Sequence, residues 1–181
     1  NHVNTLDVSI QILMRGLLIP IISFYFLLIS AVNGQQNNAV FMQEDSPWVD
    51  SLMAGMTMNE KIGQLFMVAA YSNRGESHQN EIIDLIKKEN LGGLIFFQGT
   101  AKRQAELTNF YQQTAKVPVM IAMDAEWGLA MRLPETFKFP WPITVGAIMD
   151  DQWAYEYGKA MAIHCKRLGV HINFAPTLDI N

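Results

Sequence analysis

Cysteine is nearly absent from this sequence, and charged residues are few. Cys165 is the single cysteine in 181 residues, so no disulfide can form within the chain. Charged side chains make up 17% of the residues, and the formal net charge is −4. A mildly acidic protein without a basic cluster is a poor nucleic-acid binder, which excludes that class. Half of the residues are hydrophobic, which predicts a folded globular protein with a sizeable core.

Motifs for metals and nucleotides are missing as well. The four histidines and the single cysteine form no cluster with the spacing of metal ligands, so we expect no metal and no cofactor. Neither GxGxxG nor GxxxxGKS/T occurs, although a doubly wound nucleotide-binding sheet needs such a fingerprint directly after a strand. Cys165 lies in AIHCKRLG on a predicted helix, where a buried free thiol acts as a small hydrophobe.

An apolar run near the N-terminus has the plan of a secretory signal peptide. A continuous apolar stretch, residues 17–32, follows one basic residue, and polar QQNN comes after Gly34. The stretch is shorter than the roughly 20 residues of a membrane-spanning helix, so we expect cleavage after Gly34 rather than an uncleaved anchor. Met14 is the expected start, with residues 1–13 as upstream translated sequence and 14–34 as the signal peptide. The mature protein is then exported to a bacterial periplasm or exterior, without a membrane segment.

The rest of the chain alternates between predicted helices and apolar strands. Pro47, after Ser46, is suited to begin one short helix, and Thr57 with Glu60 forms a capping box for a second. A long loop follows the third predicted strand. The strands are expected near residues 65–70, 93–97, 119–123 and 170–175, with helices between them near 78–90, 100–116 and 150–169. Strands without polar alternation, separated by helices, predict the α/β class with a parallel sheet covered on both faces.

Carboxylates follow two of these strands at equivalent places. Asp124 comes directly after VMIAM, and Asp179 comes after HINFAPTL. In a (β/α)₈ barrel the carboxyl ends of all strands open at one mouth, where the chemistry lies. The segment after Gly34 is far shorter than the about 250 residues of a complete barrel. We therefore expect the N-terminal half of a (β/α)₈ TIM barrel, in a truncated chain.

Five segments occur in the order and spacing of a known family. They are MTMNEKIGQLFMVA, LGGLIFFQG, VPVMIAMDAEWGLAMRL, FPWPITVGAIMDD and CKRLGVHINFAPTLDIN. Over residues 47–181 the chain resembles the N-terminal TIM-barrel domain of glycoside hydrolase family 3, and within it the exported β-N-acetylglucosaminidase-like members of Bacteroidetes type. The resemblance implies a retaining β-N-acetylhexosaminidase that releases terminal N-acetylglucosamine from cell-wall or chitin-type carbohydrate. A β-glucosidase or β-xylosidase of the same family, or a non-catalytic carbohydrate-binding remnant, stays open as an alternative.

The resemblance also assigns residues after the third strand. The family pattern Asp-x-Glu-Gly-Gly-x-x-x-Arg matches Asp124, Glu126, Gly128 and Arg132, with Trp127 in place of the first glycine. It implies that Asp124 hydrogen-bonds sugar hydroxyls and that Arg132 contacts the same sugar. A carboxylate accepts hydrogen bonds from vicinal hydroxyls and a guanidinium supplies a fork of donors, so such a pair suits a neutral sugar. Glu126 is expected to be structural.

The remaining assignments are weaker. Trp127 and Trp141 are candidates for stacking on the apolar face of a sugar ring. The resemblance places Asp179 near the pocket floor, where it either braces neighbouring basic residues or contacts substrate. His171 is expected to be a hydrogen-bonded core histidine, and Asp150 a helix cap. The resemblance places the Asp nucleophile and the acid/base loop beyond residue 181, so no catalytic residue is expected in this chain.

Overall fold

The computed structural model of the protein describes residues 46–177. The predictions for residues 1–13 and 14–34, and for Asp179, lie outside these residues. The chain divides into two units, Asn1–Trp48 and Val49–Asn181, and the sheet lies in the second. Within residues 46–177, no helix is both long enough and apolar enough to span a membrane.

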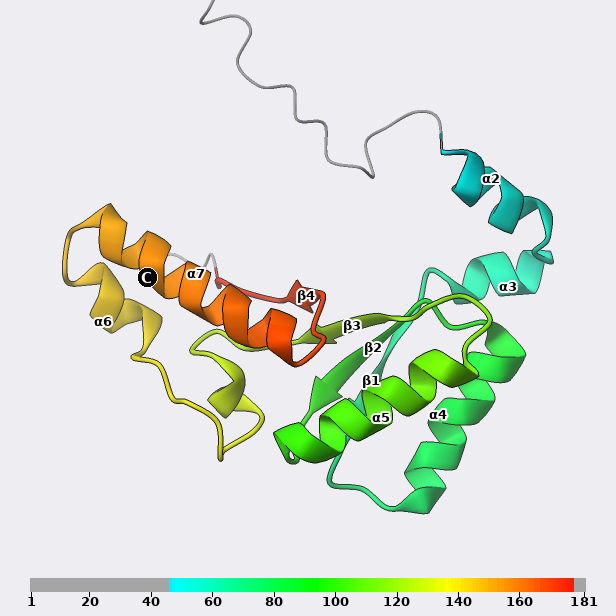
Figure 1. Cartoon of the computed structure of the whole chain (residues 1–181), viewed down its shortest axis with the longest axis horizontal. Coiled ribbons are helices and arrows are strands. Elements are labelled where there is room, and N and C mark those ends of the chain that lie inside the picture. The colour runs from blue at the N-terminus through cyan, green and yellow to red at the C-terminus, as the bar shows by residue number, and fades with distance from the viewer. Residues whose placement is uncertain (1–45, 178–181) are drawn as a thin grey trace, which may run out of the picture. The chain divides into compact units, whose positions relative to one another are not determined.

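The helices begin at the residues that local chemistry favours. Pro47 is the first residue of its helix, as predicted. The capping box is confirmed: the Thr57 hydroxyl accepts from the Glu60 N–H at 3.3 Å, and the Glu60 carboxylate accepts from the Thr57 N–H at 2.8 Å. Asp150 is confirmed as a cap. The helices are α2 (Pro47–Ala54), α3 (Met58–Gly63), α4 (Glu76–Glu89), α5 (Ala101–Thr114), α6 (Pro142–Gly146) and α7 (Asp151–Arg167), shown in Figure 1.

Parallel strands form the sheet in the described part of the chain, and they lie in sequence order. The strands are β1 (Met67–Tyr71), β2 (Gly93–Phe97), β3 (Met120–Met123) and β4 (Ile172–Asn173). Consecutive parallel strands are joined by right-handed crossovers, so an order that never reverses puts every connecting helix on the same face. A doubly wound sheet reverses its order, whereas the N-terminal half of a (β/α)₈ barrel does not. The predicted half barrel is therefore confirmed.

Helices cover one face of this sheet. Leu94 and Phe96 of β2 are 0% exposed, whereas Ile95 and Phe97 on the opposite face are only partly buried. The buried face packs against apolar residues of the helices α4, α5 and α7, namely Ile82, Ile86, Leu107, Tyr111 and Cys165. The prediction of helices on both faces is wrong for residues 46–177. The strands lack polar alternation because the inner face of a barrel is also filled by apolar side chains.

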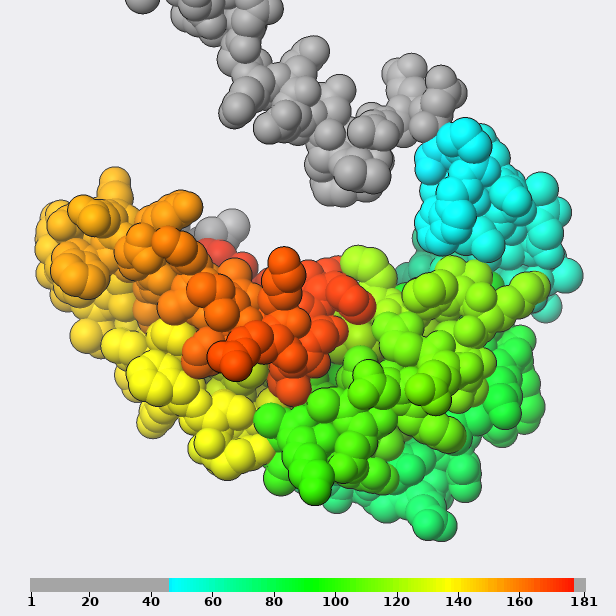
Figure 2. All heavy atoms as spheres, in the orientation of Figure 1, coloured from blue at the N-terminus to red at the C-terminus, as the bar shows by residue number. Residues whose placement is uncertain are grey.

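The helix α7 packs beside the last strand of the described sheet. Figure 2 shows its atoms, in orange, against the red atoms of the chain that follows it. Cys165 on this helix is buried, and burial raises the pKa of its thiol. A buried thiol with a raised pKa is a poor nucleophile, which agrees with its interpretation as a small hydrophobe.

Candidate functional site

An ion pair stands at the carboxyl end of β3. Asp124 directly follows the strand, and a 3₁₀ turn, Leu129–Met131, returns the chain so that Arg132 meets it. The turn is anchored by Leu129 and Leu133, which are 5% and 0% exposed. Nη2 of Arg132 donates to Oδ2 of Asp124 at 2.8 Å, and its Nε donates to the Asp124 carbonyl at 3.2 Å. The structure thus brings together two residues that the resemblance assigned to one sugar.

This pair is partly open to solvent. The Asp124 side chain is 29% exposed and the Arg132 side chain 20%. Among the hydrogen bonds formed within residues 46–177, Oδ1 of Asp124 and Nη1 of Arg132 take no part. A carboxylate oxygen accepts from a hydroxyl, and a guanidinium nitrogen donates to one. The site therefore offers an acceptor and a donor that make no hydrogen bond within residues 46–177.

Aromatic rings at the ends of β1 and β2 support the guanidinium. Cζ of Arg132 lies 4.7 Å from the ring centroid of Phe97, which stacks on Tyr71 at 5.6 Å. Tyr71 and Phe97 are register partners, and Cζ of Arg74 lies 3.7 Å from the Tyr71 ring. A cation over an aromatic face is attracted by the ring quadrupole, so the Phe97 ring restrains Arg132, and Tyr71 and Arg74 pack behind Phe97. These three supporting residues were not predicted; the signal was an aromatic residue ending two successive strands.

The turn after Asp124 has a fixed shape. The Gly128 N–H donates to the Ala125 carbonyl at 3.0 Å, which closes the turn. Gly128 has a φ of +88°, and a Cβ there would lie 2.4 Å from Cδ2 of Phe139, so only glycine fits. Trp127 is not among the non-glycine residues with positive φ in the described chain, so it occupies the turn without backbone strain. The departure from the family's glycine pattern leaves the turn intact.

A side chain from β4 holds this turn against the sheet. Oδ1 of Asn173 accepts from the Ala125 N–H at 2.9 Å, and its Nδ2 donates to the Ala125 carbonyl at 3.2 Å. Two residues earlier, Nδ1 of His171 accepts from the Ile121 N–H at 2.9 Å. His171 is hydrogen-bonded as expected, but it is exposed and not a core residue, because β4 is the edge strand of the described sheet. The role of Asn173 was not predicted.

Trp127 and Trp141 face one another. Their ring centroids are 4.3 Å apart with an interplanar angle of 39°, and Trp141 is 52% exposed. The hydroxyl of Tyr157 lies 3.1 Å from the Glu126 carbonyl and 2.9 Å from the Pro140 carbonyl. It therefore ties together the two segments that carry the tryptophans. Burial, and then the charge of Glu126, raises the pKa of Tyr157.

A cavity of about 860 Å³ lies between α6, α7 and β4. Its lining includes Glu126, Tyr157 and Asn173, and its helical wall is mainly apolar. Asp124 and Arg132 are not part of that lining, so the cavity and the ion pair are separate features. Glu126 contacts Tyr157 through its backbone carbonyl, and the structural role expected for its side chain stays a prediction.

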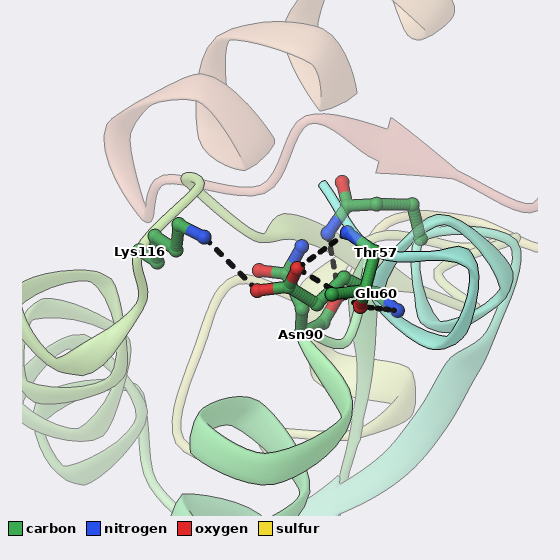
Figure 3. Close-up of polar contacts among 5 residues, drawn as sticks. Thr57, Glu60, Asn90 and Lys116 are labelled. Atoms are coloured by element: carbon green, nitrogen blue, oxygen red, sulfur yellow. Dashed lines mark hydrogen bonds and ion pairs between the residues drawn. The ribbon is translucent and has the colours of Figure 1, made fainter. Parts of the chain in front are cut away.

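A second polar cluster lies at the opposite end of the strands. The pKa of Glu60 is lowered to about 2, first by the hydrogen bond from the Thr57 backbone and then by the Lys116 ammonium, 2.9 Å away (Figure 3). Perturbed carboxylates often mark active sites. Glu60 precedes β1 and Lys116 precedes β3, however, so this cluster lies at the amino ends, where barrels place stabilising residues. We therefore assign it a structural role.

Metal coordination has no donor set in the part of the chain that the structure describes. Across residues 46–177, no three His, Cys, Asp or Glu side chains converge as a metal site. The chemistry of the site at the end of β3 is that of hydrogen bonding and aromatic stacking.

Comparison with known proteins identifies a family and relatives of this chain. The family described as "Glycosyl hydrolase family 3 N terminal domain" matches residues 57–181. Beta-hexosaminidase A of Pseudoalteromonas piscicida is 28% identical over 152 residues, which cover 70% of this chain and 25% of that protein. The beta-N-acetylglucosaminidase/beta-glucosidase of Cellulomonas fimi is 25% identical, over 74% of this chain and 23% of that protein.

A solved structure shows the same fold. The beta-glucoside phosphorylase BglX bound to 2FGlc superposes with a TM-score of 0.65 at 25% sequence identity, covering 74% of this chain and 24% of its own. The chain thus spans about a quarter of the length of these relatives.

Proposed function

The chain belongs to glycoside hydrolase family 3 by its N-terminal domain, and from this premise we propose that it forms the sugar-binding half of the barrel in a retaining β-N-acetylhexosaminidase. The observation that carries the proposal is the Asp124–Arg132 pair, at 2.8 Å, at the carboxyl end of β3. The hexosaminidase names of the Pseudoalteromonas and Cellulomonas relatives support it. The substrate is a terminal N-acetylglucosaminide of cell-wall or chitin type.

In this proposal the pair recognises the sugar without metal or cofactor. Oδ1 of Asp124 accepts from a ring hydroxyl while Oδ2 stays bonded to Arg132. Nη1 of Arg132 donates to a neighbouring sugar oxygen, and the Phe97 ring keeps the guanidinium in place. A charge-assisted hydrogen bond is worth about 1.5–3 kcal/mol, so two of them suffice for weak but specific binding. Trp127 adds an apolar contact; Asp179 stays a prediction.

Hydrolysis needs groups that we place elsewhere. A retaining glycosidase uses a carboxylate nucleophile and a proton donor about 5 Å apart. Asp124 is held by Arg132 and by its place at the strand end, and we assign it to binding rather than to attack. Nucleophile and acid/base are proposed to come from the remaining part of the family's length, so the chain by itself is expected to bind sugar without turning it over. With a signal peptide at residues 14–34, the protein is proposed to be exported.

The test is an activity profile of the product of the complete gene. Purified enzyme is assayed on 4-nitrophenyl N-acetyl-β-glucosaminide, β-glucoside and β-xyloside. We expect kcat/KM on the glucosaminide to be at least tenfold the other two. Asp124→Ala should lower kcat/KM about a hundredfold, because it removes a charge-assisted bond worth about 1.5–3 kcal/mol and leaves the Arg132 guanidinium unpaired. The matched control is Asp84→Ala, which breaks an exposed ion pair on α4 and should change nothing.

A β-glucoside-directed enzyme is the second candidate. The Cellulomonas relative is named for both activities, and the superposed structure is a beta-glucoside phosphorylase. The same assay with added inorganic phosphate separates the outcomes: free sugar indicates hydrolysis, and a sugar phosphate indicates phosphorolysis. A preference for the glucoside would refute the hexosaminidase proposal. Binding without turnover on any of the three glycosides would leave a carbohydrate-binding protein.

A further inference from the structure

A histidine closes the open edge of β1 at its carboxyl end. The Ser72 N–H donates to the Gln98 carbonyl at 3.2 Å, beside β2, so the preceding N–H, that of Tyr71, points away from β2. β1 is an edge strand of the described sheet, and such an edge presents unpaired N–H groups. Here Nε2 of His78, in the first turn of α4, accepts from the Tyr71 N–H at 3.2 Å. This bond ties the end of β1 to α4.

The bond requires a neutral histidine. A ring nitrogen that accepts a hydrogen bond carries no proton, so Nδ1 of His78 holds the ring proton and directs it to Oε2 of Glu81, 3.4 Å away. The His78 side chain is 9% exposed, and its ring packs on the Tyr71 ring in a T-shaped arrangement, with centroids 5.5 Å apart. Protonation of Nε2 would set two N–H groups against each other, so it would break the contact with the Tyr71 backbone.

Tyr71 connects this histidine to the ion pair after β3. Its ring stacks on the Phe97 ring with centroids 5.6 Å apart, and we call these two residues the aromatic row. Cζ of Arg132 lies 4.7 Å from the Phe97 centroid, and Arg132 donates to Asp124 at 2.8 Å. Each step from α4 to the proposed sugar-binding pair is therefore a direct contact, made across the carboxyl ends of β1 and β2.

Charged side chains face this histidine and its row from two elements. Glu81 lies on the same helix as His78 and is 68% exposed. Arg74, in the loop before α4, places its Cζ 3.7 Å from the Tyr71 centroid. Phe97, from β2, is uncharged. A carboxylate and a guanidinium act in opposite directions on a neighbouring charge, and neither accepts from the Tyr71 N–H, whose acceptor among the described residues is His78.

We propose that His78 is a positioning residue for sugar binding, which holds Arg132 through the aromatic row while its imidazole is neutral and loosens that hold when it is protonated. This inference rests on the proposed function and adds a regulation of the same site. Histidine is the side chain that ordinarily changes charge between about pH 5 and 8. The contribution of His78 to sugar affinity is therefore present at neutral pH and lost as the pH falls towards about 5.

The experiment measures N-acetylglucosamine binding by calorimetry from about pH 7.5 to about pH 5, with the product of the complete gene. We expect the Kd of the parent to rise about threefold on acidification, which is about 0.7 kcal/mol at 1.4 kcal/mol per tenfold. His78→Gln keeps an acceptor for the Tyr71 N–H but does not titrate, so its Kd should match that of the parent at neutral pH and stay there. His78→Ala offers no acceptor, and its Kd at neutral pH should equal that of the parent in acid.

His171→Gln is the matched control. Nδ1 of His171 also accepts from a strand N–H, that of Ile121 on β3, but His171 makes no contact with the aromatic row among the described hydrogen bonds and ring contacts. Its Kd should rise with acid as in the parent. If His78→Gln also weakened with acid, or if His171→Gln abolished the effect, the positioning role of His78 would be overturned while the Asp124–Arg132 proposal stood.

A second readout needs no sugar. The Nε–H signal of Arg132 is followed by NMR in protein with isotope-labelled arginine, and it is identified as the signal lost in Arg132→Lys. We expect it to shift over the same pH range in the parent and to stay constant in His78→Gln. A protein that binds no N-acetylglucosamine at any pH would refute the proposed function. This signal then decides the role of His78: a shift lost in His78→Gln supports it, and a shift that is absent from the parent or kept in the variant overturns it.

Discussion

Replacement of Asn173 by alanine is expected to destabilise the fold and loosen the loop that carries the site. The amide of Asn173 makes two hydrogen bonds to Ala125, which is 0% exposed. The Ala125 carbonyl keeps its bond from the Gly128 N–H after the substitution, but the Ala125 N–H loses its only acceptor among the described residues. An unsatisfied buried donor costs about 1–3 kcal/mol. We therefore expect the free energy of unfolding to fall by about 2 kcal/mol.

The assay is urea unfolding followed by far-ultraviolet circular dichroism, with the midpoint shifting and the slope unchanged. Asn80→Ala, on the exposed face of α4, is the matched control and should stay within about 0.5 kcal/mol of the parent. Asn173→Asp keeps an acceptor for the Ala125 N–H and should cost less than alanine. A near-ultraviolet signal from the Trp127–Trp141 pair reports the turn directly. If Asn173→Ala matched the control in stability and in this signal, the two hydrogen bonds from Asn173 to Ala125 would have no role in holding the turn.

Three further predictions concern other contacts. Phe97→Leu keeps apolar volume but removes the cation–π contact with Arg132, worth about 1 kcal/mol, and should weaken N-acetylglucosamine binding about fivefold by calorimetry. Glu60 has its pKa lowered from 4.5 to about 2, so its carboxylate stabilises the fold above about pH 4.5 and loses this contribution as the pH falls towards 2; an NMR titration with a midpoint near 4.5 would contradict this. Gly128→Ala should lower the free energy of unfolding measured with urea, because its φ is +88°, whereas Gly158→Ala, with open space at the Cβ on α7, should raise that free energy by about 0.5–1 kcal/mol. Equal effects would contradict the steric argument.

Helices and strands were predictable wherever their signals are local. Pro47 and the Thr57–Glu60 capping box determine where two helices begin, and both signals lie within four residues of the helix start. The four strands lie where apolar runs predicted them, although β4 has only two residues. The helix α6 was not predicted, because five residues are too short to show a helical period.

The two sides of the sheet could not be distinguished from the strands alone. An apolar run is equally consistent with a strand between two layers of helices and with a barrel strand whose inner face packs on other strands. Strand order settles the question, since only an order without reversal puts all crossovers on one face. Strand order depends on pairing between segments that are distant in sequence, and a single sequence does not record that pairing.

The contacts at the site also divide into those within one short segment, which the sequence predicts, and those between segments distant in sequence, which it does not. Asp124 and Arg132 stand eight residues apart in one segment, so a continuous pattern was enough to pair them. Asn173 reaches Ala125 across 48 positions, and Phe97 approaches Arg132 from another strand. Asn173 carries no pattern of its own, and the aromatic residue that ends β2 does not by itself name Arg132 as its partner. What holds the loop in place is therefore visible only once the strands are assembled.

Trp127 shows how a departure from a pattern can mislead when it is judged by sequence alone. A tryptophan in place of a glycine suggests a distorted turn, because glycine usually marks a backbone conformation that other residues avoid. Only the second glycine position, Gly128, has a positive φ and a ring against its Cα, and it is still glycine. The first position has an ordinary backbone and is free to carry a side chain. The large residue placed there packs against Trp141, so the substitution gives this chain an aromatic contact between the turn and the segment before α6.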